Sequence, residues 1–575
     1  MSVRPRSNIT KCRDAFGIPC YRGILIIILS TAIPTAIAAQ TAIPAPNTVT
    51  PPTLQPEHGP ELPAILLPPT ETLSPPTGAE DFRFTPGQVS VEGAFPRVAS
   101  AVASLARTIE GRTVTLADVY RMASAIEAAH ARQGFVLARV SIPPQRLVDG
   151  GPVRIVVTDG FIESIDVSGV PRQLRNVVAA RLTGLRDVPQ LTLARIERQI
   201  LLAGDVAGAT LRSTLARGDK PGGVRLLIDG QWRPLRASLR ADNAVDRSLA
   251  DASVTVQVSL NGLLGLGETI YAYAATSDPL RPLASDTRVR VIGTGVLLGI
   301  GDGRLTLNPE ATLARTQPLA PPGVPRTQGR LERYAIRTTY VLARTRFHQD
   351  LLDFSIEALD QRTTAIDFGS DIARDRYAVA RLGASVARIS ALASWSLAGQ
   401  VGQGLGHLVS DLTVPPTRQD ALATFTKLSG QGRVLIPVGR HVSWSAVALA
   451  QTSFGRPLLR AEQFQLEGSE AVSVFVGGVT AVDEGLTLRS ELSVPVAVRQ
   501  MTFAPYVFAA GGFGHVARPT SVEAGHLLAG AIGVGARTTI ANGRLGLGFE
   551  YGYGFANLPA IDGCERVNFT ASVRF

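Results

Sequence analysis

The chain has 575 residues, of which 45% are hydrophobic and only 18% are charged, with 56 glycines and a formal net charge of +10. A helical membrane protein gathers its apolar residues in runs of about 20, and the sequence has no such run after residue 40. The apolar residues alternate with polar ones instead, which fits a soluble all-β protein or a transmembrane β-barrel. The basic residues form no runs interleaved with aromatic residues, so nucleic-acid binding is not expected.

The N-terminus has the pattern of a secretory signal peptide. Basic residues precede the apolar run 24–29, and small residues follow it up to Ala38 and Ala39. This order predicts a signal peptide over residues 1–39, cut near Ala38 or Ala39. A retained anchor is the alternative, but the run is short and Pro34 interrupts it. The mature chain would keep Cys564 as its single cysteine and form no internal disulfide.

Residues 40–81 are rich in proline. Such a composition predicts an extended, semi-rigid linker and makes a long helix improbable. A docking peptide for a partner is the alternative reading. The prolines of this segment are Pro44, Pro46, Pro51, Pro52, Pro56, Pro60, Pro63, Pro68, Pro69, Pro75 and Pro76.

Residues 82–160 have the order strand, helix, helix, strand, strand. The first strand contains Val89 and Val91, and the later strands are predicted over 136–142 and 153–157. Thr115 and Asp118 form a predicted capping box for the second helix. The inner face of that helix is Val119, Met122, Ile126 and Ala129, its C-terminal stop is Gly134, and His130 is expected on its exposed side.

Residues 161–232 are predicted to repeat this α+β scheme. A strand over 162–167 is followed by helices over 174–182 and from Thr192 to Gly204, and a strand over 224–228 closes the unit. Two small mixed domains in tandem are therefore expected before residue 233.

From residue 233 to the C-terminus, the helical periodicity disappears and alternating segments follow one another. Their number is 16, and an even number is typical of bacterial barrels. The longest connection, 453–484, is too long to be a turn. The segments are 235–242, 254–261, 268–276, 288–297, 304–314, 330–343, 351–361, 377–389, 393–403, 423–436, 442–452, 485–495, 502–511, 528–538, 544–553 and 567–575.

The last segment has one apolar and one polar face. Phe569, Val573 and the terminal Phe575 lie on the apolar face, alternating with polar residues such as Asn568 and Arg574. A chain-terminal aromatic residue on the lipid side is typical of bacterial outer-membrane barrels. These three residues are predicted to form the signal that the barrel assembly machinery reads.

The sequence offers little for catalysis. The histidines form no H-x-x-x-H pair, and no serine lies in a G-x-S-x-G motif. The glycine-rich run of Gly402, Gly404 and Gly406 has strand and turn surroundings, which does not fit a phosphate-binding loop. We therefore expect no catalytic residues, no metal and no cofactor.

The segment GFVLARVSIPPQ at 134–145 resembles a signature of the two-partner secretion transporters, the haemolysin and filamentous haemagglutinin secretion/activation proteins. These are relatives of the BamA assembly factor. The resemblance implies two POTRA domains in the periplasm (82–160 and 161–232), preceded by a periplasmic linker, and then a 16-stranded barrel in the outer membrane of a Gram-negative cell. It also implies that the 453–484 loop folds back into the barrel and gates the pore.

This chain departs from the family pattern in that loop. Family members usually have V-R-G-Y there, and their arginine pairs with an aspartate two strands later. Here the sequence has Val474, Phe475, Val476 and Gly477, and Ala510 takes the aspartate's place. Because replacing both partners of a buried ion pair is often neutral, we expect Phe475 to pack near Ala510 and hold the loop by contact. Asp483 and Gly485, at the end of the loop, complete the predicted gate.

The resemblance implies that the POTRA domains capture an unfolded, β-helical adhesin or haemolysin and that the barrel exports it. Strand edges would bind the client, with candidate residues Leu137, Arg139, Val140, Ile142 and Gln145 in the first domain and Val224 and Leu226 in the second. Membrane lipid and the assembly machinery are the other expected partners. A BamA-like assembly factor and a passive porin remain alternatives: the first usually has five POTRA domains, and the second would not need any.

Overall fold

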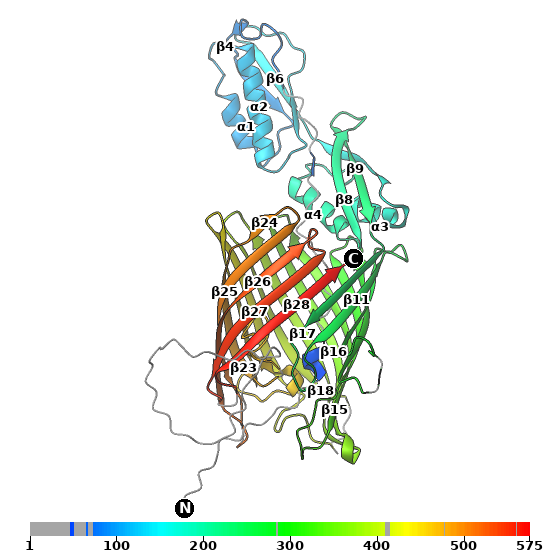
Figure 1. The fold of residues 1–575 in the computed structure, drawn as a ribbon. Helices are drawn as coiled ribbons and strands as arrows, with labels where there is room; N and C mark the ends of the chain where they lie inside the picture. The colour runs from blue at the N-terminus through cyan, green and yellow to red at the C-terminus, as the bar shows by residue number, and fades with distance from the viewer. Residues whose placement is uncertain are drawn as a thin grey trace, which may run out of the picture.

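The computed structural model describes residues 46–50, 65–66, 73–282, 284, 286–408, 414–476, 478–521, 523–558 and 561–575. The expected signal peptide, most of the expected linker and Gly477 lie outside these residues. Among the described residues, no helix has both the length and the apolar character needed to cross a membrane. The chain folds into two α/β units followed by a closed β-barrel (Figure 1).

The first unit has the predicted order of elements. It contains β3 (Gln88–Glu92), α1 (Ala99–Ala106), α2 (Leu116–Arg132), β5 (Arg139–Ser141) and β6 (Pro152–Thr158), with the short strands β2 (Arg83–Phe84) and β4 (Val114–Thr115) beside them. In the sheet β3-β6-β5, β6 is parallel to β3 and antiparallel to β5. The predicted capping box at Thr115 and Asp118 is formed, and Val119 and Ile126 are fully buried.

Two expectations for this unit are wrong. His130 is buried, with Nδ1 at 2.9 Å from the Ile126 carbonyl oxygen and its ring edge-on to Phe95, because α2 is covered on more than one side. The strand predicted over 136–142 is reduced to β5, because the residues before it pack on the second unit. Leu137 lies in the second unit's core, and Leu193 N donates to Gly134 O at 2.8 Å.

The second unit contains β7 (Phe161–Gly169), α3 (Arg172–Leu182), η2 (Thr183–Leu185), α4 (Leu193–Gly204), β8 (Ala209–Arg217) and β9 (Gly223–Trp232). Strand β8 was not predicted. The sheet order is β1-β8-β9-β7, and β1 (Ile65–Leu66) comes from the proline-rich segment. Thr192 precedes α4 as expected, although its side chain makes no capping hydrogen bond.

The barrel closes by pairing its last strand, β28, with its first, β10. Every predicted segment overlaps a strand, and β23 and β24 both pair with β25 as one interrupted strand, so the described barrel has sixteen strands. The strands are β10 (Leu235–Asp242), β11 (Ser253–Asn261), β12 (Thr269–Thr276), β13 (Val289–Ile300), β14 (Leu305–Thr316), β15 (Thr327–Arg344), β16 (His348–Ala365), β17 (Ser370–Ile389), β18 (Ser394–His407), β19 (Thr426–Val438), β20 (Val442–Thr452), β23 (Glu484–Ser493), β24 (Val496–Val498), β25 (Met501–His515), β26 (His526–Ile540), β27 (Leu545–Ala556) and β28 (Cys564–Arg574).

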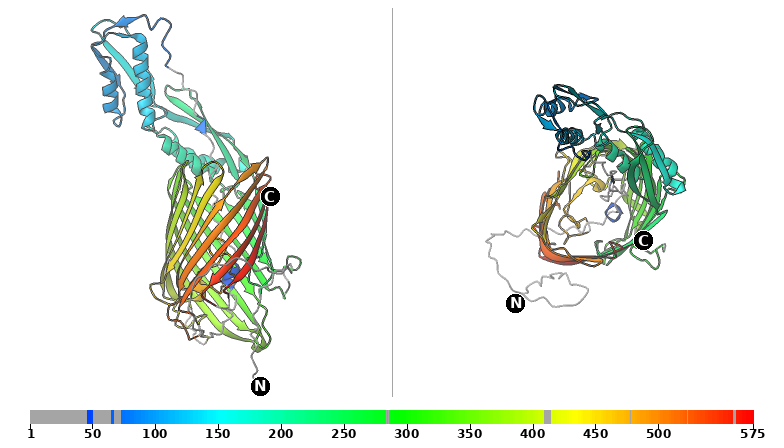
Figure 2. Two further views of the ribbon diagram at one scale, coloured as in Figure 1. Left: turned by 60° about the vertical axis from the view of Figure 1, so that its left-hand side comes forward. Right: turned by 90° about the horizontal axis from the view of Figure 1, so that it is seen from above.

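The alternation of side chains along the strands separates an apolar outer face from an inner face. In β26, Leu528 and Ile532 are exposed, whereas the intervening Ala529 and Ala531 are buried. Seen along its axis, the barrel is a ring that encloses several loop segments (Figure 2). We call its end beside the second α/β unit the proximal end and the opposite end the distal end.

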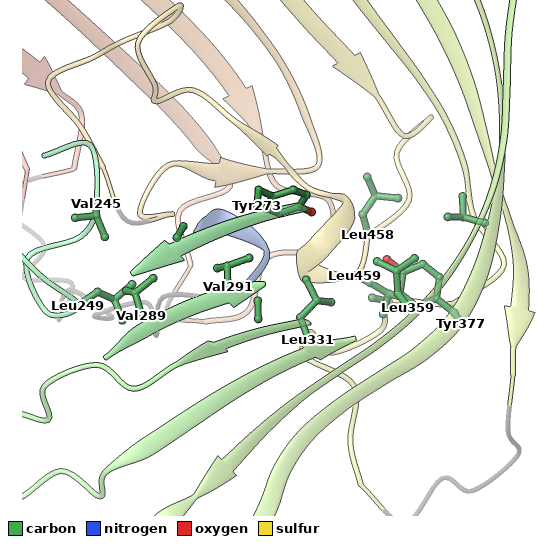
Figure 3. Packing of buried hydrophobic residues seen from close by; sticks show 14 of the residues in the cluster. Val245, Leu249, Tyr273, Val289, Val291, Leu331, Leu359, Tyr377, Leu458 and Leu459 are labelled. Carbon is green, nitrogen blue, oxygen red and sulfur yellow. The ribbon is translucent and has the colours of Figure 1, made fainter. Parts of the chain in front are cut away.

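Part of the proline-rich segment lies inside this ring. The 3-10 turn η1 (Pro46–Val49), blue in Figure 2, contacts β14 and β15. Pro46 is buried over Gly329, where a Cβ would come within 2.6 Å of its ring, and Val49 packs against the buried cluster shown in Figure 3. The expectation that residues 40–81 are only a linker outside the barrel is therefore wrong for this turn.

Candidate functional site

The connection between β20 and β23 folds into the barrel. It contains η4 (Arg460–Glu462), β21 (Phe464–Gln465) and β22 (Ala481–Val482), and the last two pair with each other. Glu484 holds the base of the loop, because its carboxylate accepts from Thr452 Oγ1 at 2.8 Å and from the backbone of Ser453 and Gly455. Leu458 and Leu459 pack against inward residues of the barrel strands (Figure 3). The loop thus fills part of the lumen.

Glu462 makes the first ionic anchor of the loop. Its carboxylate pairs with Arg381 of β17 at 2.7 Å and Lys427 of β19 at 2.9 Å, and Tyr377 OH donates to it at 2.8 Å. Burial alone would raise the pKa of Glu462, but the two cations lower this pKa to about 2. The carboxylate therefore stays charged at neutral pH and fixes the loop to two strands.

Asp483 makes a second anchor near the distal end. It is fully buried, pairs with Arg418 from the β18–β19 connection, and accepts from Leu458 N and Ala517 N, both at 2.8 Å. Arg418 also donates to Ala517 O at 2.8 Å. One carboxylate thereby joins three distal loops, which gives the predicted gate residue Asp483 a clear structural role.

Ser473 holds the tip of the loop through uncharged groups, beside a half-exposed ion pair between the loop residue Glu470 and Arg433 of β19. Its hydroxyl donates to Glu550 of β27 and accepts from Arg489 of β23 at 2.9 Å, and Asn568 donates to its carbonyl at 2.9 Å. Arg489 and Glu550 form a buried ion pair with each other, and Tyr506 OH donates to Glu550 at 2.8 Å. We call Ser473, Arg489 and Glu550 the lock of the loop tip. Both of its charged residues belong to the barrel wall.

Next to Ser473, the predicted gate residues pack by apolar contact. Val474 and Phe475 are buried in one cluster with Ala510. They lie over Gly552 and Gly554 of β27, where a Cβ would come within 2.7 Å of Val474 and 2.9 Å of Phe475. The structure therefore brings Phe475 and Ala510 together. Gly485 makes room in the same way for Phe464.

The sequence did not single out the charged partners of the loop. Glu550 carried a usable signal, because it is the one acidic residue of a strand made mainly of glycine, leucine and aromatic residues. Arg381, Arg418 and Glu462 carried none, since charged residues are frequent on the inner faces of barrel strands and in loops.

Three of the seven predicted client-binding residues of the α/β units lie in the core. Leu137, Val140 and Leu226 are buried, so their side chains are not accessible to a bound chain in this structure. Arg139 donates to the carbonyls of Val136 and Ala138. Gln145 completes the sheet: its amide accepts from Arg154 N at 2.8 Å and donates to Arg154 O at 2.7 Å. The remaining residues, Ile142 and Val224, are half-buried.

The second unit is fastened to the proximal end of the barrel. Asp205, just after α4, pairs with Arg344 of β15 at 2.8 Å, and Glu197 of α4 pairs with Arg346 at 2.7 Å. Arg181 of α3 is buried against Gly299 and Gly303, at the turn between β13 and β14, and burial lowers the pKa of its guanidinium. The unit and the barrel therefore meet through both ion pairs and close packing.

The side chains of the C-terminal strand point to the sides of the barrel wall that the sequence predicted. Phe569 and Phe575 are exposed on the outside of the barrel, Val573 is half-buried, and Phe575 N donates to Ala237 O of β10 at 2.9 Å. The role of these residues in assembly stays a prediction.

Comparison with known proteins supports this architecture. The chain is 23% identical over 176 residues to the heme/hemopexin transporter protein HuxB of Haemophilus influenzae (strain 86-028NP), a match that covers 30% of this chain and 31% of that relative. Solved structures of CdiB from Escherichia coli and from Acinetobacter baumannii share the fold. The match to the Escherichia coli structure has a TM-score of 0.69 at 19% identity and covers 92% of this chain and 94% of that CdiB chain. The match to the Acinetobacter baumannii structure has a TM-score of 0.60 at 15% identity and covers 94% of this chain and 95% of that CdiB chain.

Two family profiles match the sequence itself. The ShlB-type POTRA domain matches residues 84–160, which is the first α/β unit. The haemolysin secretion/activation protein ShlB/FhaC/HecB profile matches residues 224–538, more than half of the chain. This chain therefore belongs to the haemolysin secretion/activation protein family.

Proposed function

We propose that this protein exports one unfolded exoprotein through its barrel. The observation that carries the proposal is the barrel itself: its lumen is occupied by a loop that is anchored to the wall at separate points and by the turn η1, and two α/β units stand at its proximal mouth. A permanently open porin would need neither the loop anchors nor the α/β units. Members of this family are transporters rather than enzymes.

A sixteen-stranded barrel of this family lies in the outer membrane. We place the proximal end and both α/β units in the periplasm, where a client delivered by the general secretory route would meet them. The client would then pass through the lumen after the loop and η1 move aside. The outer membrane has no nucleotide supply, so folding of the client outside the cell supplies direction.

The anchors favour movement of the loop as one piece. Its tip is joined to the wall by hydrogen bonds to Ser473, by apolar contacts and by the half-exposed ion pair of Glu470 with Arg433, all of which are individually modest. Glu462 and Asp483 are the stronger anchors, and both lie in the parts of the loop nearer to its ends. A client that pushes the tip from the proximal side would therefore meet the weaker contacts first.

The test compares culture medium and outer membrane from cells with and without this protein. Loss of one large exoprotein from the medium, with its fragments in the periplasm, is the expected result and identifies the client. Unchanged secretion together with depleted outer-membrane barrels would instead establish an assembly factor, and no change in either would leave a channel. Restoring the wild-type chain controls for indirect effects.

A further inference from the structure

The turn between β11 and β12, residues 262–268, lies at the proximal end of the barrel and carries three exposed leucines. The exposed fractions of Leu263, Leu264 and Leu266 are 53%, 68% and 54%. At the same end of the barrel, the turn between β26 and β27 presents the polar Asn542. Leucines that face water together are unfavourable, and such a patch marks a surface that meets an apolar partner. We call these three residues the leucine cluster.

A buried carboxylate fixes the backbone of this turn. Glu268 is 1% exposed, and its carboxylate accepts from Leu264 N at 2.7 Å and from Leu266 N at 3.1 Å. Gly262 N donates to the carbonyl oxygen of Glu268 at 2.7 Å and closes the turn. Hydrogen bonds to a charged acceptor are stronger than those between neutral groups. The leucines are therefore held in their exposed positions by the turn itself.

The glycine side of the turn packs on the second α/β unit, which lies at the proximal end on the side of β11 (Figure 1). A Cβ on Gly262 would come within 2.7 Å of Leu174 of α3. Trp232, the last residue of β9, donates from Nε1 to the carbonyl oxygen of Asn261 at 3.2 Å. The second unit thus covers the glycines of the turn and leaves the leucine cluster open.

The outer face of the barrel leads directly to the leucine cluster. Leu235 of β10 and Ile270 of β12 both lie opposite Leu260 of β11, so the three side chains form an apolar row across neighbouring strands. Farther along β11, Val256 and Val258 are exposed on the same face. The outer face of an outer-membrane barrel contacts lipid. The leucine cluster therefore continues the lipid-facing surface beyond the ends of the strands.

We propose that the leucine cluster inserts into the membrane leaflet at the proximal end and rests the second α/β unit on the lipid surface. Lipid is favoured over a protein partner because the cluster is continuous with the lipid-facing side of the barrel. Arg172 and Arg233, from the two segments of the second unit that adjoin the turn, are exposed, and arginines at this level suit lipid phosphates. Because Leu174 packs on the turn, insertion sets the height of α3 above the bilayer. This role does not depend on export.

Fluorescence quenching by lipid tests this inference. Leu264→Cys, in a Cys564→Ser background that removes the remaining cysteine of the mature chain, carries a fluorophore in nanodiscs of phosphatidylethanolamine and phosphatidylglycerol. Part of the lipid has a nitroxide near the headgroup end of an acyl chain. We expect this lipid to quench the label about as strongly as a label at Val258→Cys and at least about threefold more than a label at Asn542→Cys. Heat-modifiability on gels checks that each barrel has assembled.

Glu268→Ala provides a second readout, because it frees the amides of Leu264 and Leu266. In this variant, quenching of the Leu264 label by the nitroxide lipid should fall by at least about half. Glu332→Ala, which breaks a half-exposed ion pair on β15, is the matched control and should leave the quenching unchanged.

Iodide in the water separates the remaining outcomes. A Leu264 label that iodide quenches as strongly as the Asn542 label lies in water, and this result would overturn the inference. A label that is shielded from both iodide and the nitroxide lipid touches protein. That result would also overturn the inference and would assign the leucine cluster to a protein partner.

Discussion

The lock on the loop tip is distributed differently from the pattern that the family resemblance implies. In this chain, Phe475 stands at the loop position where family members usually have an arginine. The charged pair is formed instead by Arg489 and Glu550, both on the barrel wall. Ser473 joins the loop to that pair through its hydroxyl. Separating a buried ion pair leaves a desolvated charge behind, whereas moving Ser473 away leaves Arg489 and Glu550 paired. Releasing the tip therefore separates no buried ion pair; the pair that does part, Glu470 with Arg433, is half-exposed and contributes little.

Glu550 is the residue on which most of this lock depends. Replacing Glu550 with alanine removes the acceptor for Arg489, Tyr506 and Ser473. We expect a loss of stability of about 3–5 kcal/mol, the usual cost of leaving one buried partner unpaired, measured as a lower temperature of heat-induced unfolding on gels. Glu332→Ala, which breaks the half-exposed pair with Arg330, is the control and should cost less than about 1 kcal/mol. Equal effects would contradict this view of the lock.

Phe475 and Ala510 permit a test by charge restoration. Phe475→Arg buries an unpaired charge in the apolar cluster, and Ala510→Asp adds a carboxylate opposite Arg489, which already pairs with Glu491 and Glu550, so each should destabilise the barrel by several kcal/mol, on the order of 3–5. The double variant re-creates the family's expected pair and should cost clearly less than the sum. Unfolding temperatures of all four proteins complete the cycle. Additive effects would show that the two positions do not face each other.

At the scale of elements, the sequence predicted the barrel strands well because one physical rule governs each of them. Outer residues must be apolar and inner ones need not be, so every strand shows its own alternation. Strand β8 was missed because its buried positions, Leu211, Ser213 and Leu215, include a serine. The anchors of the loop could not be predicted, because pairs such as Glu462 with Arg381 join residues far apart in the sequence.

The anchor at Glu462 should open only in strong acid. Its pKa is lowered from 4.5 to about 2 by Lys427 and Arg381, so its stabilising contribution is complete above about pH 4.5 and is lost as the pH falls towards 2. As the pH falls over this range, we expect the rate of pepsin cleavage near Leu458 in the wild-type protein to rise relative to the rate in the Glu462→Gln variant, which lacks the titrating group. A constant ratio between the two proteins would show that this carboxylate does not control the loop.

The seam between β10 and β28 depends on one side-chain amide. This pairing has five residue pairs, and Asn243 extends it by donating to Val567 O and accepting from Phe569 N, both at 2.8 Å. Asn243→Ala should remove about 1–3 kcal/mol and lower the unfolding temperature. The control is Asn557→Ala, whose amide makes the same two kinds of bond beside the longer β26–β27 pairing. A larger effect of the control would show that the seam is not the weak point.

At the scale of the whole molecule, the attachment of the second unit to the barrel determines whether a client that binds the α/β units can influence the pore. Residues 134–137 fix the first unit to the second, and the second is fixed to the barrel at Asp205 and Glu197. The signature segment therefore acts as a structural joint in this chain, which explains why most of its side chains are buried or bonded to the backbone. A rigid path from the α/β units to the barrel mouth would let one client contact both at fixed spacing.

Arg344 is the buried member of the barrel junction, with a side chain that is 6% exposed. Arg344→Ala should weaken the junction by about 1.5–3 kcal/mol, the usual worth of a hydrogen bond to a charged group, and let the second unit move more freely. Spin labels at Thr210 and at Leu392, on the proximal β17–β18 turn, would report this as a broader distance distribution in a Cys564→Ser background. Arg326→Ala, which removes an exposed pair with Asp367 at the distal end, should leave the distribution narrow. The distance distribution of Arg344→Ala could also stay narrow while export is lost. Arg344 would then act on the client path itself, and the rigid attachment must come from Arg181 and the packing around it.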